Sequence, residues 1–262
     1  TVPSLYGEKI VLRLLDPGSI LIDLERLVTN EPAYRAIRWM LDQRQGMMVI
    51  AGPTGSGKTT TLYSALLRLR QDDINILTIE DPVEYTIEGV TQVQVNEPAG
   101  VTFANTVRTF LRQDPDVILV GETRDPLTAS TSVEAALTGH LVLTTLHAND
   151  APGVMVRLRE MGVESFLLAH TVVGVISQRL VRRICPHCRE PASYHPQLVR
   201  PLGILREDDP ATSYTFYRGR GCVHCNHQGF RGRAGAFEIL RIDDRLRPLV
   251  AGGVSGPRLA EA

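Results

Sequence analysis

The chain has 262 residues, which is enough for one large or two modest domains with a buried core. Its 43% hydrophobic and 22% charged content is that of an ordinary soluble globular protein. Twenty-eight basic and 29 acidic residues give a formal charge of −1, so composition shows no basic surplus for nucleic acid and leaves only a local patch open. The longest apolar stretch, residues 166–176, is too short to span a bilayer, and from these residues alone we expect no signal peptide.

The first forty residues are predicted to hold one strand and then helical patches. Residues 8–15 have the pattern of a strand that ends at Pro17. Because the chain begins abruptly, we expect residues 1–18 to be the tail of a truncated N-terminal domain. Residues 20–43 contain helical patches with a break in the middle, where Asn30 is a candidate helix cap.

A glycine-rich segment lies between an apolar run at residues 47–51 and a predicted helix at 60–70. It satisfies the pattern Gly, four residues, Gly-Lys-Ser/Thr, and in this context it favours a nucleoside triphosphate site over a chance turn. Its backbone N–H groups and the positive end of the helix would face the phosphates. Lys58 is expected to reach the β- and γ-phosphates, and the Thr59 hydroxyl to ligate Mg²⁺. The predicted nucleotide-binding residues are Gly52, Pro53, Thr54, Gly55, Ser56, Gly57, Lys58, Thr59 and Thr60.

Acidic residues follow two further predicted strands. Glu80 and Glu84 follow the apolar run at residues 75–79, and Glu122 follows the run at 117–120. In open parallel sheets ligands bind just beyond the carboxyl ends of strands, so these acids are expected to face the triphosphate. There they would orient or deprotonate water or hold Mg²⁺, although a solvated acidic turn is the alternative for the first pair. The second run resembles a Walker B strand, except that glycine replaces its first acid and leaves the carboxylate role to Glu122.

Helices and strands alternate through the middle of the chain. Helices are predicted over residues 102–113 and 123–137, and a strand over residues 141–145. This alternation specifies a parallel, doubly wound sheet. Two more amphipathic helices are predicted over residues 154–161 and 165–181.

One histidine and a pair of arginines stand out in this region. His147 follows the strand at residues 141–145, where a histidine can contact the γ-phosphate; an ordinary loop histidine is the alternative. Arg108 and Arg112 are four residues apart and share the polar face of their predicted helix.

All four cysteines fall in two Cys-x-x-Cys pairs, Cys185 with Cys188 and Cys222 with Cys225. This set predicts a structural zinc ion with four thiolate ligands and no open position, while two disulfides or idle thiols are the alternative. The 33 residues between Cys188 and Cys222 exceed the usual ribbon spacing of roughly 15–20, so the insert should be a sizeable excursion closed by the metal.

These motifs divide the chain into four predicted parts. They are the tail at residues 1–18, a nucleotide-binding core at 19–181, a tetracysteine module at 182–235 and a C-terminal helical segment at 236–262. A local basic run precedes and enters the cysteine module; it is read as a solvated helix end or, alternatively, as a site for phospholipid or another polyanion. Its members are Arg179, Arg182, Arg183 and Arg189.

Taken together, the motifs resemble the C-terminal motor domain of the ATPases of bacterial type II secretion and type IV pilus assembly. The matching segments are the Walker A loop at residues 52–59, an acidic box at 78–85, the Walker B strand at 114–122, a histidine box at 138–147 and the tetracysteine module. The resemblance covers nearly the whole chain. It implies an α/β fold, with a RecA-like P-loop core around a parallel-rich sheet, a small zinc module and a helical C-terminal piece.

The resemblance also implies roles for single residues. The general base is expected at Glu84 more than at Glu80, Glu122 would help hold Mg²⁺ and its water, and two histidines would read the γ-phosphate. An arginine near the N-terminus would act as a finger toward bound phosphate, and a second finger would lie upstream of the chain, so weak hydrolysis and poor hexamer formation are expected for this segment alone. The candidate catalytic residues are therefore Glu84, Glu122, His147, His140, Arg13, Arg108, Arg112 and Glu80.

The implied protein is a cytoplasmic hexameric ATPase at the inner-membrane face that uses ATP, Mg²⁺ and structural Zn²⁺. It would act on an inner-membrane platform protein, with a membrane-recruiting component, to build a pseudopilus for secretion or to extend a pilus. The tetracysteine module disfavours the pilus-retraction branch but does not separate secretion from extension.

Two other functions stay open on the sequence. A nucleic-acid motor, such as a RecA-like helicase or a conjugation ATPase, would use the same loop and sheet. The near-zero charge and 5% aromatic content argue against it, so no nucleic-acid partner is expected. The other is a zinc-stapled interaction module whose nucleotide site is only a switch.

Overall fold

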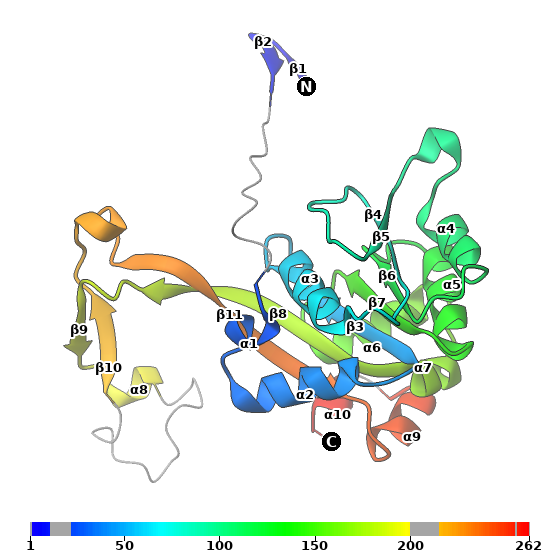
Figure 1. The fold of residues 1–262 in the computed structure, drawn as a ribbon. Coiled ribbons are helices and arrows are strands. Elements are labelled where there is room, and N and C mark those ends of the chain that lie inside the picture. The colour runs from blue at the N-terminus through cyan, green and yellow to red at the C-terminus, as the bar shows by residue number, and fades with distance from the viewer. Residues whose placement is uncertain (1, 11–21, 200–214, 255, 262) are drawn as a thin grey trace. The chain divides into compact units, whose positions relative to one another are not determined.

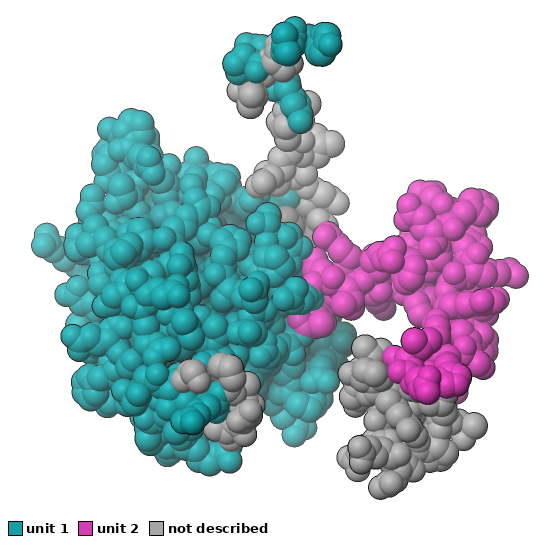
Figure 2. Space-filling model, turned by 180° about the vertical axis from the view of Figure 1, so that it is seen from behind, with its two compact units in different colours: residues 1–179, 237–262 teal, residues 180–236 magenta. Residues whose placement is uncertain are grey.

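The computed structural model describes residues 2–10, 22–199, 215–254 and 256–261 (Figure 1). The chain divides into two compact units, one of residues 1–179 and 237–262 and the other of residues 180–236 (Figure 2). Among the described residues, no helix is long and apolar enough to cross a membrane.

A seven-stranded sheet in the order β11-β8-β3-β7-β6-β4-β5 organises the first unit. The pairs from β8 to β5 are all parallel. Edge strand β11 is antiparallel to β8. The backbone N–H of Ile242, just after the end of β11, donates to the carbonyl oxygen of Val173 near the start of β8. The predicted parallel-rich α/β sheet is confirmed. Its strands are β3 (Gly46–Ala51), β4 (Ile76–Glu80), β5 (Thr91–Gln94), β6 (Val117–Val120), β7 (Leu141–Leu146), β8 (Val172–Ile184) and β11 (Phe230–Arg241).

Helices cover both faces of this sheet, so the central strands β3, β6 and β7 are buried along their whole length and consist mainly of apolar residues. Alternate residues of β3 enter two separate clusters: Met47 and Val49 face one way, and Met48 and Ile50 face the other. The second cluster is covered by α1 (Leu24–Leu27), α2 (Glu31–Leu41) and α3 (Lys58–Leu69). The first is covered by α4 (Phe103–Phe110), α5 (Pro126–Leu137), α6 (Ala151–Glu160), α7 (Ser165–Thr171), α9 (Leu246–Ala251) and α10 (Gly256–Glu261).

Polar side chains cap the helices that follow loops. The Asn30 side chain accepts a hydrogen bond from the N–H of Ala33 at 3.0 Å, so the predicted cap is confirmed. Thr102, Asp125 and Asp150 cap α4, α5 and α6 in the same way, which fixes where each helix begins after its strand.

Two predicted helical segments contain strands instead. The helix predicted over residues 165–181 is wrong, because α7 ends at Thr171 and β8 begins at Val172. Short apolar runs do not distinguish a buried helix from a buried strand by periodicity, and the β-branched residues here pack well between β3 and β11. The C-terminal segment at residues 236–262 likewise begins in β11 and becomes helical only at α9.

The second unit consists of the outer ends of β8 and β11 with a small hairpin and short helical turns. Strands β9 (Arg189–Ala192) and β10 (Phe216–Gly219) pair antiparallel, and α8 (Pro196–Val199) follows β9. A 3₁₀ turn at Val223–Cys225 carries the last cysteine.

The N-terminal residues form a two-stranded hairpin in which β1 (Val2–Ser4) pairs antiparallel with β2 (Gly7–Lys9). The strand predicted over residues 8–15 starts here, but its residues from 11 onward, Arg13 among them, lie outside the described part of the chain.

Candidate nucleotide site and tetracysteine cluster

The glycine-rich loop joins the end of β3 to the start of α3, and β3 is flanked by β7 and β8. Gly52, Gly55 and Gly57 have φ angles of 147°, 76° and 88°, in the region that glycine tolerates and other residues rarely adopt. A Cβ at Gly52 would collide with the backbone carbonyl of Gln178 and with Ser56 Oγ. Because α3 begins at Lys58, the free N–H groups and positive end of the helix face this turn, which is the geometry of an anion-binding loop.

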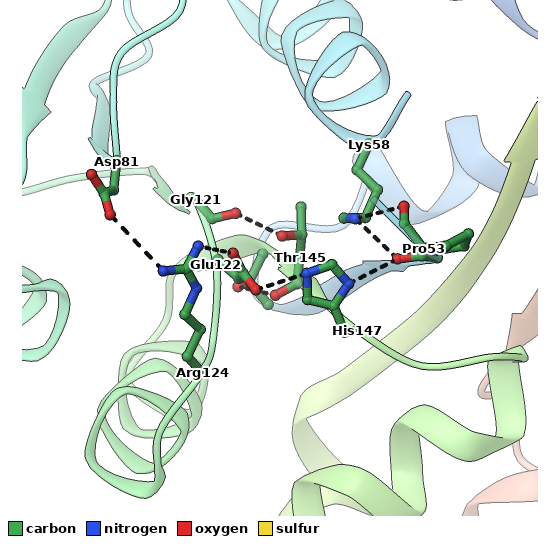
Figure 3. Close-up of polar contacts among 10 residues, drawn as sticks. Pro53, Lys58, Asp81, Gly121, Glu122, Arg124, Thr145 and His147 are labelled. Atoms are coloured by element: carbon green, nitrogen blue, oxygen red, sulfur yellow. Dashed lines mark hydrogen bonds and ion pairs between the residues drawn. The ribbon is translucent and has the colours of Figure 1, made fainter. Parts of the chain in front are cut away.

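Lys58 lies across the loop. Its Nζ donates hydrogen bonds to the carbonyl oxygens of Gly52 at 2.9 Å and Pro53 at 3.2 Å (Figure 3). Burial lowers the pKa of Lys58, and the negative charge of Glu122 partly offsets that effect. The ammonium group is therefore held beside the backbone that would surround a phosphate.

Glu122 follows β6 with its side chain only 16% exposed, and both carboxylate oxygens have partners. Oε1 lies 3.1 Å from His147 Nε2, and Oε2 lies 2.7 Å from Arg124 Nη2. The other ring nitrogen of His147, Nδ1, is 3.2 Å from the carbonyl oxygen of Gly52. His147 thus bridges the Glu122 carboxylate and the glycine-rich loop (Figure 3). The sequence predicts that Glu122 and His147 each follow the carboxyl end of a strand.

The ends of β6 and β7 are also tied together, next to the residues of this bridge. Thr145 Oγ1 donates to the carbonyl oxygen of Gly121 at 2.7 Å (Figure 3). Gly121 also lies against the backbone of Glu80, where a Cβ would be tightly packed. The glycine in place of the first Walker B acid therefore permits a close approach of neighbouring strand ends.

Arg124 belongs to this cluster and was not among the sequence candidates. Besides Glu122, its guanidinium approaches Asp81, with Nη1 4.0 Å from Oδ2. The hydrogen bond to Glu122 and that carboxylate's charge raise the pKa of Arg124. An arginine two residues after a strand-end acid was the available signal, because it must lie at the same edge of the sheet.

Glu80 is 4% exposed and is held by three donors. Its carboxylate accepts hydrogen bonds from Tyr63 Oη at 2.5 Å, Thr78 Oγ1 at 2.6 Å and Gln92 Nε2 at 3.1 Å. The Tyr63 hydroxyl in turn accepts from the backbone N–H of Glu84 at 3.2 Å. This geometry contradicts a direct catalytic role for Glu80, which anchors the segment that carries half-buried Glu84.

His140 lies at the amino ends of the strands, whereas the glycine-rich loop lies at their carboxyl ends. It precedes β7, whose first residue Leu141 pairs with Gly46 at the start of β3, whereas the loop follows the end of β3. A strand of six residues separates the two positions, about 20 Å at 3.3 Å per residue. His140 Nδ1 instead contacts the carbonyl oxygen of Ala135 at 2.9 Å. The prediction that His140 reads a γ-phosphate bound by its own chain's loop is therefore wrong.

The other candidates are not drawn into this cluster. Arg108 lies on α4 and Arg112 just beyond its end, and both side chains are exposed. The backbone carbonyl of Gln113, next to Arg112, accepts a hydrogen bond from the side chain of Asn75, which precedes β4. This end of α4 therefore lies near the amino ends of the strands, away from the glycine-rich loop. Arg13 lies outside the described residues. Thr59 and Thr60 occupy the first turn of α3, with Thr59 exposed. The Thr59 hydroxyl and the Glu122 carboxylate are hard oxygen donors of the kind Mg²⁺ takes, so the site fits that ion chemically.

Three cavities of about 200, 320 and 460 Å³ share His147 in their walls. The smallest also touches Gly52 and Pro53, and the largest extends along the start of α6 to Glu238. Open space therefore adjoins the start of the glycine-rich loop at His147.

The second unit brings the four cysteine sulfurs within 4.8 Å of one another. Three Sγ–Sγ distances are 3.8–3.9 Å, and a tetrahedral zinc site with bonds of about 2.3 Å has edges of about 3.8 Å. Burial opposes ionisation of Cys225, but hydrogen bonds from the backbone N–H groups of Cys222 and Gly229, together with those from the Cys222 and Cys188 thiols, outweigh it and lower the pKa of Cys225 to about 6. Free thiols at this spacing fit a tetrahedral zinc ion and are too far apart for disulfides.

The parallel-rich sheet with a glycine-rich loop between β3 and α3 defines a P-loop nucleotide-binding protein with a RecA-like core. The family described as "Type II/IV secretion system protein" matches residues 1–259, and the chain belongs to it.

Named relatives and a solved structure resemble the chain over almost its full length. Type II secretion system protein E of Dickeya dadantii is 49% identical over 255 residues, which are 97% of this chain and 50% of that protein. The type IV pilus assembly ATPase PilB of Myxococcus xanthus is 45% identical over 260 residues, 99% of this chain and 46% of that protein. A crystal structure of the pilus retraction motor PilT with bound ADP has a TM-score of 0.66 at 28% identity, covering 95% of this chain and 60% of that one. The chain thus spans about half the length of the curated relatives it matches.

Replacing Tyr63 with phenylalanine should destabilise the acidic segment after β4. The change removes one hydroxyl from a buried position and leaves the Glu80 carboxylate and the Glu84 N–H each without one partner. We expect the free energy of unfolding to fall by about 1–3 kcal/mol, measured by urea denaturation. Tyr34→Phe is the matched control, because its hydroxyl pairs with Glu25 at the surface and its loss should cost much less. Equal losses in the two variants would contradict the anchoring role.

Removing zinc should unfold the second unit and spare the first. Cys188→Ser or a strong chelator is expected to abolish one bound zinc per chain, measured by elemental analysis, and to make residues 180–236 sensitive to protease. Nucleotide binding should persist, because the glycine-rich loop and its partners all lie in the first unit. Loss of zinc and of nucleotide binding together would contradict this separation.

Proposed function

We propose that this chain is the ATP-hydrolysing segment of a motor that powers assembly of a pseudopilus for type II secretion or extension of a type IV pilus. The observation that carries the proposal is the continuous link from Glu122 through His147 to the carbonyl of Gly52. It joins a strand-end carboxylate to the glycine-rich loop, so a phosphate chain bound by the loop would have acidic, basic and imidazole groups around it. The names of the relatives support the choice of type II secretion or pilus assembly as the process that the motor drives.

In this proposal the loop N–H groups and Lys58 hold the phosphates of ATP. The Thr59 hydroxyl and, through water, Glu122 would hold Mg²⁺, which neutralises charge on the phosphates when bound. Glu84 accepts a proton from the attacking water. Support for this assignment comes from Tyr63, because its hydroxyl contacts the Glu84 backbone from α3, the helix that begins at Lys58.

His147 and Arg124 would respond to the bound phosphate. A neutral imidazole can donate to only one of its two present neighbours, so a change at the loop redistributes the hydrogen bonds of His147. Arg124 is 60% exposed and pairs with Glu122, and it offers the developing negative charge a cation from the same chain.

We further propose that the motor is a homohexamer that binds an inner-membrane platform protein and a membrane-recruiting component at the cytoplasmic face, with acidic phospholipid as an additional contact. Arg108, Arg112, Arg13 and His140 would act on the nucleotide of a neighbouring copy. For Arg108, Arg112 and His140 the proposal is supported by their position toward the amino ends of the strands, away from the loop of their own chain. The tetracysteine module would be a structural zinc staple.

Glu84→Gln should separate nucleotide binding from hydrolysis. In the assembled protein we expect phosphate release to fall by about 10²–10⁴-fold, since a general base contributes an effect of that size, with the Kd for ATP unchanged. Lys58→Ala should abolish both. Glu88→Gln, an exposed acid on the same loop, is the matched control and should retain full activity.

Three results would count against the proposal. Hydrolysis by Glu84→Gln at the parent rate would remove Glu84 as the base. A parent protein that binds ATP without turnover would favour a nucleotide switch. Stimulation of turnover by DNA with a steep salt dependence would favour a nucleic-acid motor.

A further inference from the structure

Gln178 is a buried polar residue that sequence patterns did not single out. It lies on β8 one residue beyond Ser177, which pairs with Ala51, so it stands beside the start of the glycine-rich loop. Its exposure is 1%, and a buried amide is costly unless its donor and acceptor both have partners. Its backbone carbonyl also occupies the space into which a Cβ at Gly52 would project.

The side chain of Gln178 has a partner at each end. Nε2 donates to the carbonyl oxygen of Ser56 at 2.8 Å, and Oε1 accepts from Thr61 Oγ1 at 2.7 Å. Ser56 and Thr61 are themselves buried. One amide therefore ties β8 both to the last turn of the loop and to the first turn of α3.

The bond to Ser56 fixes the orientation of one peptide group in the loop. A trans peptide is planar, and its C=O and N–H point in opposite directions. Since Gln178 draws the Ser56 carbonyl toward β8, the N–H of Gly57 points away from β8 and into the turn. N–H groups of this loop are the donors that surround the α- and β-phosphates of a nucleotide.

We propose that Gln178 is a positioning residue for nucleotide binding, which holds the Ser56–Gly57 peptide with its N–H toward the phosphates. This rests on the proposed function in that it requires the loop to bind a nucleotide. Without the amide, the Ser56 carbonyl loses its buried partner and the peptide is free to rotate, so that a carbonyl oxygen can face the phosphate and repel it.

The test is Gln178→Met, which keeps the length of the side chain and removes its donor. We expect the Kd to rise about tenfold for both ATP and ADP. It is measured with fluorescent nucleotide analogues on the assembled protein. KM for ATP should rise with Kd, while kcat at saturating ATP stays within about threefold of the parent, because ground state and transition state lose the same contact. If Gln178 served stability alone, its replacement would lower the melting temperature without raising KM at an unchanged kcat.

Two further variants make the result decisive. Ser132→Ala removes a hydroxyl that is also fully buried but bonds within α5, and its Kd should match the parent's. Gln178→Glu keeps the shape and faces the Ser56 carbonyl with an acceptor, so it should weaken binding at least as much as methionine; it supplies the test if Gln178→Met does not fold.

Folded Gln178 variants that bind ATP and ADP as tightly as Ser132→Ala would overturn this inference and leave the proposed function standing. A parent protein that binds no nucleotide would overturn the proposed function itself.

Discussion

The site depends on the parallel pairing of β3, β7, β6 and β4, because only parallel strands bring their carboxyl ends to one edge of a sheet. The glycine-rich loop, Glu84, Glu122 and His147 each follow a different strand, and they lie between residues 52 and 147 of the sequence. Parallel pairing in turn needs helices on both faces, and the two apolar clusters on either side of β3 provide the burial that stabilises the arrangement.

Buried polar groups then set the fine geometry at that edge. Tyr63 and Glu80 hold the acidic segment against α3, Gln178 holds the loop against β8, and Thr145 holds β6 against β7. Each side chain is almost fully removed from water, and each fixes a backbone segment at the site. Such groups stabilise one geometry because an unpaired donor or acceptor in the interior is costly. The loops are therefore held by a rigid layer beneath them.

Local patterns predicted much of this. The strand–loop–helix at Lys58, the cap at Asn30 and the two cysteine pairs depend on residues close together in sequence, whereas β8 was mistaken for a helix because a short apolar run fits either element. The role of His140 came from the family resemblance, whereas its place directly before the strand predicted over residues 141–145 already indicated the opposite end of the strands from the loop. The contacts of Gln178 with Ser56 and Thr61 join residues more than a hundred positions apart, and no local pattern encodes them.

The central claim is that the strand-end carboxylate and the glycine-rich loop act as one unit through His147. A double-mutant cycle on kcat, with Glu122→Gln, His147→Ala and the pair, measures that coupling directly. If the two residues act through each other, the double variant will lose little more activity than the more damaged single variant. Losses that multiply, or a His147 variant with the activity of the parent, would contradict the claim.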